Sequence, residues 1–138
     1  MNPLLYELNT RCWLRGLSDK AGIAITLANV PASELAEWQK LGFTHIWLMG
    51  AWTSGPASRA EALKLPELRQ AYDQALPGWQ EADVTGSPYA IAAYEVPADL
   101  GGEAGLAQFR QKLNERGLKL VLDFVPNHVG LDHPWLTE

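Results

Sequence analysis

The sequence predicts an α/β fold built on a parallel sheet. Strand-like segments alternate with helix-like segments along the 138 residues, which is the pattern of a sheet with helical crossovers. The run at 118–122 is nearly continuously apolar, as expected of a strand buried on both faces. This run leads into Asp123, Asn127 and His128, and buried parallel strands present polar groups at their C-terminal ends.

Three strands are expected, at residues 4–8, 43–49 and 118–124, and the first could extend to Leu14. A closed barrel of eight parallel strands needs about 250 residues. Three strands cannot close one. The chain is therefore either an open α/β domain or part of something larger.

Two main helices are expected, at residues 33–41 and 103–116. Ser33 can cap the first helix, and Gly42 and Gly117 can end the two helices. Each helix carries apolar residues at helical spacing on one face. These inward residues are Leu35, Trp38 and Leu41 in the first helix, and Leu106, Phe109 and Leu113 in the second.

The segment at about 50–102 is irregular and contains five prolines. Helical stretches are expected within it at 58–65 and 66–75. A connection of more than about forty residues is uncommon, and such segments usually serve as lids or binding loops. We expect one domain over residues 1–138, with this segment as an insertion.

Composition narrows the class of protein. A hydrophobic content of 47% argues against disorder, and no apolar run reaches the roughly 18 residues of a membrane span. The N-terminus lacks the basic flank and long apolar segment of a secretory signal. A net charge of −5 without a basic cluster argues against a nucleic-acid partner. The single cysteine, Cys12, fits a reducing compartment, so we expect a cytoplasmic protein without a membrane partner.

The polar segment after the third expected strand is the main candidate site. Asp123 can order a neighbouring arginine or accept hydrogen bonds from loop amides. His128 can donate a hydrogen bond to a hydroxyl ligand without carrying charge. The alternative is that Asp123 and Asn127 only cap and turn the chain. For this motif alone the alternative is favoured, because short motifs arise often by chance.

Two further segments precede this motif in the same order along the chain. One is Gly42-Phe-Thr-His-Ile-Trp-Leu48, and the other is Gly86-Ser-Pro-Tyr89-Ala-Ile-Ala-Ala-Tyr94, followed by Leu100-Gly-Gly102. Together with Asp123-Phe-Val-Pro-Asn127-His128, they resemble the alpha-amylase family of glycoside hydrolases and transglycosidases, over about residues 43–135. The resemblance implies a (β/α)8 barrel, of which this chain would supply the first three strands and two main helices.

The resemblance also implies roles for the matching residues. Tyr89 would stack under a sugar ring, whose C–H face is apolar, and His128 would hydrogen-bond a hydroxyl of the same ring. Asp123 would steady an arginine of the active site. Asn127 matches a position that binds structural calcium in many members. Calcium takes about six to eight oxygen ligands, and the sequence identifies no others, so we expect no cofactor and favour a turn role for Asn127.

No catalytic residue is expected in this chain. In the family, a nucleophile in Gly-x-Arg-x-Asp and a glutamate acid/base follow the fourth and fifth strands, and neither is present. The parent protein is expected to act on an alpha-glucan or small alpha-glucoside by retaining chemistry. This chain would supply the sugar-binding side and be inactive alone. It would pair with the missing half of the barrel, or self-associate edge to edge.

Two other hypotheses remain. One is a non-catalytic sugar-binding or regulatory module of the same fold, and the other is an unrelated α/β domain. The sequence departs from the family at Met49-Gly50, where a proline is usual, and at Ala90 and Ala93, where polar residues are common.

Other candidate residues have simpler explanations. His45 fits a histidine satisfied within a strand. A metal cluster of Asp123, His128 and His133 matches no known metal-binding spacing. Trp52 and Trp79 either extend a sugar-binding surface or pin the long segment in place.

Overall fold

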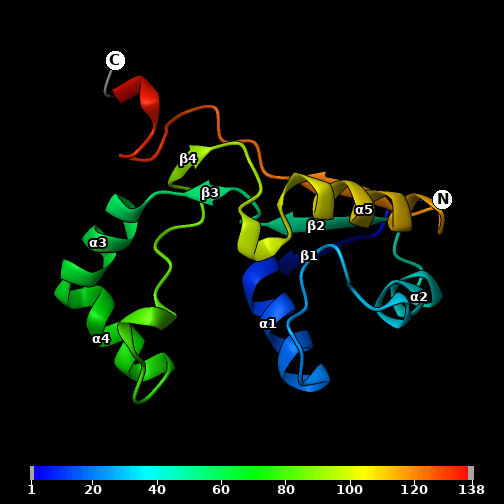
Figure 1. Ribbon diagram of the computed structural model, residues 1–138, viewed down its shortest axis with the longest axis horizontal. Coiled ribbons are helices and arrows are strands. Elements are labelled where there is room, and N and C mark those ends of the chain that lie inside the picture. Colours follow the sequence, from blue (N-terminus) through cyan, green and yellow to red (C-terminus); the bar gives the residue numbers. More distant parts are fainter. Residues whose placement is uncertain (1, 137–138) are drawn as a thin grey trace. The chain divides into compact units, whose positions relative to one another are not determined.

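The computed structural model describes residues 2–136 (Figure 1). The described chain separates into two compact units. Unit 1 comprises residues 2–51 and 95–124, and unit 2 comprises residues 52–94 and 125–136. Each unit is built from two segments that lie far apart in the sequence. The polar motif is divided between the units, because Asp123 belongs to unit 1 and His128 to unit 2.

Unit 1 contains a three-stranded parallel sheet. Its strands are β1 (Leu5–Asn9), β2 (His45–Met49) and β5 (Lys119–Leu122), in the order β1-β2-β5. Leu8 lies opposite Leu48, which lies opposite Leu122, and Leu8 and Leu48 are buried. The three parallel strands predicted from the sequence are thereby confirmed; β2 and β5 are shorter than expected, and β1 is shifted by one residue.

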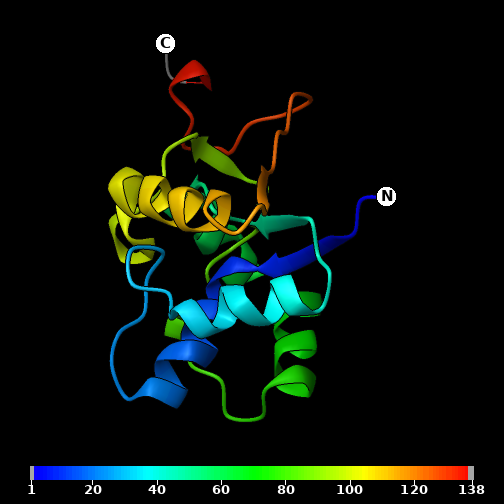
Figure 2. The same cartoon turned by 90° about the vertical axis from the view of Figure 1, so that its right-hand side faces the viewer.

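Three helices lie beside this sheet (Figure 2), and an aromatic cluster links them to it. They are α1 (Thr10–Ala21), α2 (Ala32–Lys40) and α5 (Gly102–Asn114), and a short 3-10 turn, η2 (Ala98–Leu100), precedes α5. Trp38 of α2 lies 6.0 Å from the ring of Tyr6, 5.4 Å from Trp13 and 6.4 Å from Phe109. These rings come from β1, α1 and α5, so the helices share one core.

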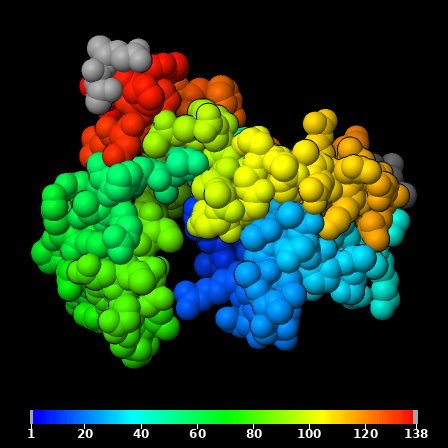
Figure 3. Space-filling model, in the orientation of Figure 1, coloured from blue at the N-terminus to red at the C-terminus, as the bar shows by residue number. Residues whose placement is uncertain are grey.

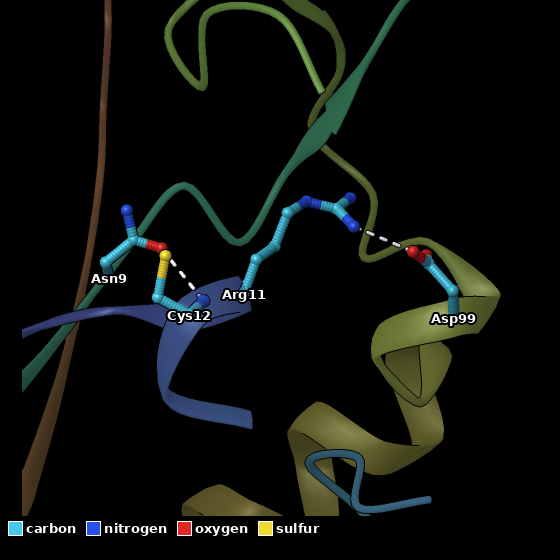
Figure 4. Close-up of polar contacts among 4 residues, drawn as sticks. All are labelled: Asn9, Arg11, Cys12 and Asp99. Carbon is cyan, nitrogen blue, oxygen red and sulfur yellow. Dashed lines mark hydrogen bonds and ion pairs between the residues drawn. The ribbon is translucent and has the colours of Figure 1, made fainter. Parts of the chain in front are cut away.

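Helix α1 corrects the expectation that the first strand could reach Leu14. The side chain of Asn9 accepts a hydrogen bond from the amide of Cys12 and caps the helix (Figure 4). Thr10, Leu14 and Leu17 are buried on one face, at helical and not strand spacing. The cap and this spacing favour a helix from residue 10 onward.

Figure 4 also shows an ion pair at the start of α1. The Nη1 atom of Arg11 lies 2.7 Å from the Oδ2 atom of Asp99 in η2. The side chain of Asp99 remains 64% exposed, so solvent screens this pair.

The start of helix α2 differs from the prediction in its cap. Pro31 occupies the N-cap position without a side-chain hydrogen bond, and Ser33 lies inside the helix. Leu35 and Trp38 are buried as expected, whereas Leu41 at the C-terminal end is 57% exposed. In α5, Phe109 and Leu113 are buried as predicted, and Leu106 is only half-buried.

Unit 2 contains the two helices expected in the long segment. These are α3 (Pro56–Lys64) and α4 (Pro66–Ala75), each with proline in its first turn, where the missing amide hydrogen costs nothing. They pack against each other and form the green part of Figure 3. A two-stranded antiparallel ribbon joins β3 (Thr53–Ser54) to β4 (Ile91–Ala93). Two 3-10 turns, η1 (Glu81–Asp83) and η3 (Pro134–Leu136), complete the unit.

Within residues 2–136, no helix has the length and apolar character needed to cross a membrane.

Candidate functional site

The loop at residues 125–132 is held against the segment that contains β4. The amide of Val125 donates a hydrogen bond of 2.9 Å to the hydroxyl of Tyr94, and this hydroxyl donates one of 3.2 Å to the carbonyl of Val125. Farther along, the amide of Gly130 donates to the carbonyl of Ile91 at 2.8 Å. The loop is therefore anchored on both sides of Asn127 and His128.

The imidazole of His128 is engaged at both nitrogens. Its Nε2 atom lies 3.1 Å from the main-chain carbonyl oxygen of Tyr89, and its Nδ1 atom lies 2.9 Å from Oδ1 of Asn127. A carbonyl oxygen only accepts, so Nε2 carries the proton. In this tautomer Nδ1 can only accept, so the side chain of Asn127 donates to it when its amide nitrogen faces the ring.

Tyr89 and His128, the two residues expected to bind sugar, are thus neighbours in unit 2. Tyr89 is half-buried, and its amide donates a hydrogen bond of 3.3 Å to the hydroxyl of Ser87, within the turn before β4. His128 is exposed. The link between them runs through the main-chain carbonyl of Tyr89.

Asp123 lies in unit 1, just after the end of β5, and is only 8% exposed. Its Oδ1 atom accepts a hydrogen bond from Nε1 of Trp47, and its Oδ2 atom accepts one from the amide of Gly50, both at 2.7 Å. Gly50 has a φ of +71°, a conformation that glycine adopts readily. The carboxylate ties the end of β5 to the end of β2.

Trp47 was missed as a partner of Asp123 by sequence reasoning. The register of β2 against β5 predicts this contact, because Trp47 lies opposite Val121. Side chains two residues apart in a strand share a face, so a residue at 123 projects to the same side as residue 121 and its neighbour Trp47.

Asp132 was also missed. Helix α3 begins after Gly55 and has no side-chain cap of its own. The Oδ2 atom of Asp132 accepts a hydrogen bond of 3.0 Å from the amide of Ala57, in the first turn of α3. A carboxylate there is favoured by the helix dipole. A Cβ atom on Gly55 would collide with Asp132.

The remaining candidates have local partners. Nδ1 of His45 lies 2.8 Å from the hydroxyl of Thr44, and Nδ1 of His133 accepts from the amide of Trp135 at 3.2 Å. Among residues 2–136, no three His, Cys, Asp or Glu side chains lie close enough together to hold a metal ion.

The two tryptophans of the long segment each pack edge-on against a tyrosine. Trp52 lies 5.4 Å from Tyr94, and Trp79 lies 5.2 Å from Tyr72. Nε1 of Trp79 also donates to Asp73 at 2.8 Å. These contacts are consistent with the interpretation that the two tryptophans hold the segment in place.

Comparison with known proteins places this arrangement in a family. The family described as "Alpha amylase, catalytic domain" matches residues 32–138. A glucan 1,6-alpha-glucosidase of Streptococcus dysgalactiae subsp. equisimilis is 28% identical over 90% of the chain and 18% of its own length. The alpha-amylase SusG of Bacteroides thetaiotaomicron is 39% identical over 36% of the chain and 7% of its own length.

Solved structures agree on the fold. A trehalose-6-phosphate hydrolase of Bacillus licheniformis superposes with a TM-score of 0.61 at 17% identity, over 99% of this chain and 19% of its own. This chain therefore spans only a small part of the relatives it matches. The predicted fold class, the first part of a (β/α)8 barrel, is confirmed. Since the catalytic-domain match covers well over half of its residues, the chain belongs to the alpha-amylase family.

Proposed function

We propose that this chain contributes the sugar-binding side of a site acting on alpha-glucosidic bonds, with Tyr89 and His128 as the binding residues. The observation that carries the proposal is the hydrogen-bonded link between Nε2 of His128 and the main chain of Tyr89. It keeps an aromatic ring and an imidazole donor on neighbouring residues of one unit. An aromatic face and a nearby hydrogen-bond donor suit the apolar face and hydroxylated rim of a pyranose.

The protonation of the imidazole defines how such binding would work. Nε2 carries the donor hydrogen, and this hydrogen points to the carbonyl of Tyr89. A sugar hydroxyl that accepts this hydrogen must share it with the carbonyl oxygen of Tyr89, or take the place of that oxygen as the acceptor. Sugar binding should therefore change the environment of Nε2 directly.

The names of the relatives support an alpha-glucoside as the ligand. They include a glucan 1,6-alpha-glucosidase and an alpha-amylase. Bond cleavage in the parent protein would need a nucleophile and an acid/base, which lie outside residues 1–138 in this proposal. We therefore propose that the chain alone binds sugar and does not hydrolyse it.

The test is a titration of the 138-residue chain with maltotriose and isomaltotriose, with the β-linked cellotriose as control, followed by tryptophan fluorescence and calorimetry. Saturable binding of an alpha-linked trisaccharide is expected. The variants Tyr89→Ala and His128→Ala should each weaken it by about two- to tenfold, the worth of one hydrogen bond or stacking contact.

His133→Ala is the matched control for His128→Ala. It removes a histidine of the same unit whose Nδ1 atom accepts from the nearby amide of Trp135. It should bind sugar as the wild type does. Absence of any response from a folded wild-type chain would contradict the proposal.

A further inference from the structure

We propose that Tyr94 is a positioning residue that aims His128, an inference that rests on the proposed function. Tyr94 lies just after β4 and has no expected contact with sugar. Its hydroxyl instead holds the main chain of Val125, three residues before His128. The orientation of the imidazole would thus depend on the hydroxyl of Tyr94, outside the proposed sugar-binding pair.

The hydroxyl of Tyr94 fixes both the position and the orientation of Val125. It accepts from the amide at 2.9 Å and donates to the carbonyl at 3.2 Å of the same residue. A phenolic hydroxyl has one donor hydrogen and can also accept, so it satisfies both groups at once. Two hydrogen bonds to one residue leave its main chain little freedom to rotate.

The ring of Tyr94 is itself held in place. It packs edge-on against Trp52, with 5.4 Å between the ring centroids and an angle of 68° between the planes. Trp52 directly precedes β3, and β3 pairs with β4. A phenylalanine at position 94 would keep this packing and lose both hydrogen bonds to Val125.

A second anchor lies beyond His128. Gly130 donates to the carbonyl of Ile91, and a Cβ atom on Gly130 would lie 2.6 Å from the carbonyl oxygen of Ala90. Residues 126–129 therefore span two fixed points, both on the segment 89–94. Release of the first point moves the nearest anchor before His128 from Val125 back to Asp123. The hydrogen bond of His128 to Tyr89 then loses the constraint that aligns it.

The experiment compares Tyr94→Phe with wild type in the full 138-residue chain. The amide of Val125 should exchange its hydrogen about tenfold faster or more in the variant, because its acceptor is lost. The two ring nitrogens of His128 should shift in NMR toward an average of both tautomers. Affinity for maltotriose should fall by about three- to tenfold.

Tyr72→Phe is the matched control. It removes the hydroxyl of another tyrosine of unit 2, whose ring packs edge-on against Trp79. It should leave Val125, His128 and the affinity as in wild type. Wild-type exchange at Val125 and wild-type nitrogen shifts in Tyr94→Phe would overturn the proposal.

A second variant separates positioning from stability. Trp79→Phe weakens the packing against Tyr72 and leaves the ring and hydroxyl of Tyr94 untouched. Even where it lowers the melting temperature as much as Tyr94→Phe does, it should leave the ring-nitrogen shifts of His128 near those of the wild type. Equal displacement of His128 in both variants would overturn the proposal. If the wild type binds no sugar, the proposed function fails, and the NMR comparison still decides the role of Tyr94.

Discussion

The carboxylate of Asp123 accepts a hydrogen bond of 2.7 Å from the indole of Trp47 and thereby joins the C-terminal end of β5 to β2. The second carboxylate oxygen accepts from the amide of Gly50 at the same distance. One side-chain donor and one main-chain donor thus depend on the same buried carboxylate. These two hydrogen bonds, both within unit 1, explain why an acidic residue follows the apolar strand β5.

Asp123→Asn should destabilise the chain although it keeps the volume of the side chain. The amide nitrogen of asparagine must face one of the two donors, and a buried donor without an acceptor costs about 1–3 kcal/mol. Urea unfolding measures this loss. Asp19→Asn is the control, because Asp19 is exposed on α1 and should change stability little. Equal effects of the two substitutions would contradict this account.

Gly130→Ala should displace the loop that carries His128. The added Cβ atom would lie 2.6 Å and 2.8 Å from the carbonyl oxygen and carbon of Ala90, and overpacking of this kind costs about 1–3 kcal/mol. Gly16→Ala is the matched control. It lies inside α1 with no atom near the new Cβ, and should stabilise by about 0.5–1 kcal/mol. Thermal unfolding should show shifts of opposite sign.

Asn9 should matter more for stability than the ion pair beside it. Asn9→Ala removes the cap of α1, which is worth about 0.5–2 kcal/mol. Asp99→Ala removes an exposed ion pair with Arg11, worth about 1 kcal/mol or less and further reduced by salt. Unfolding at low and high salt measures both. A larger loss of stability for Asp99→Ala than for Asn9→Ala at high salt would contradict this ranking.

Unit 1 should self-associate beside β5. A groove of about 470 Å³ lies between α5 and this strand, and among the described residues β5 pairs only with β2. The groove is lined by Glu103, Leu106, Ala107, Arg110, Leu120 and Leu122. An open strand edge beside apolar surface favours association.

Sedimentation velocity over a wide concentration range measures this association. Leu106→Glu places a charge in the groove and should reduce it, whereas Leu41→Glu changes an exposed leucine outside the groove and should not. A monomer at all concentrations, with one sharp unfolding transition, would contradict the prediction.

Much of the fold could be predicted from local patterns. Strand β2 ends where expected, and β1 and β5 end within two residues of their expected ends. Helices α3 and α4 occupy the expected stretches, because prolines at residues 56 and 66 mark their first turns. Helix α1 was missed because its first turns were assigned to a continuation of the first strand as far as Leu14. The cap at Asn9 and the spacing of Leu14 and Leu17 carry the helical signal.

The candidate site could be predicted only in part. Motif order pointed to Tyr89 and His128, and the structure places them next to each other. The contacts of Tyr94 with Val125 and of Asp132 with α3 join residues 31 and 75 positions apart. Such contacts depend on how β4 and the loop meet in space, which no local pattern encodes.

The measurement that tests the central claim most directly is the ¹⁵N spectrum of the His128 ring during a titration with maltotriose. We expect a protonated Nε2 in the free chain and a saturable shift of its signal, with the ring signals of Tyr89 moving at the same midpoint. Saturable binding that leaves both rings unchanged would contradict the claim that Tyr89 and His128 bind the sugar.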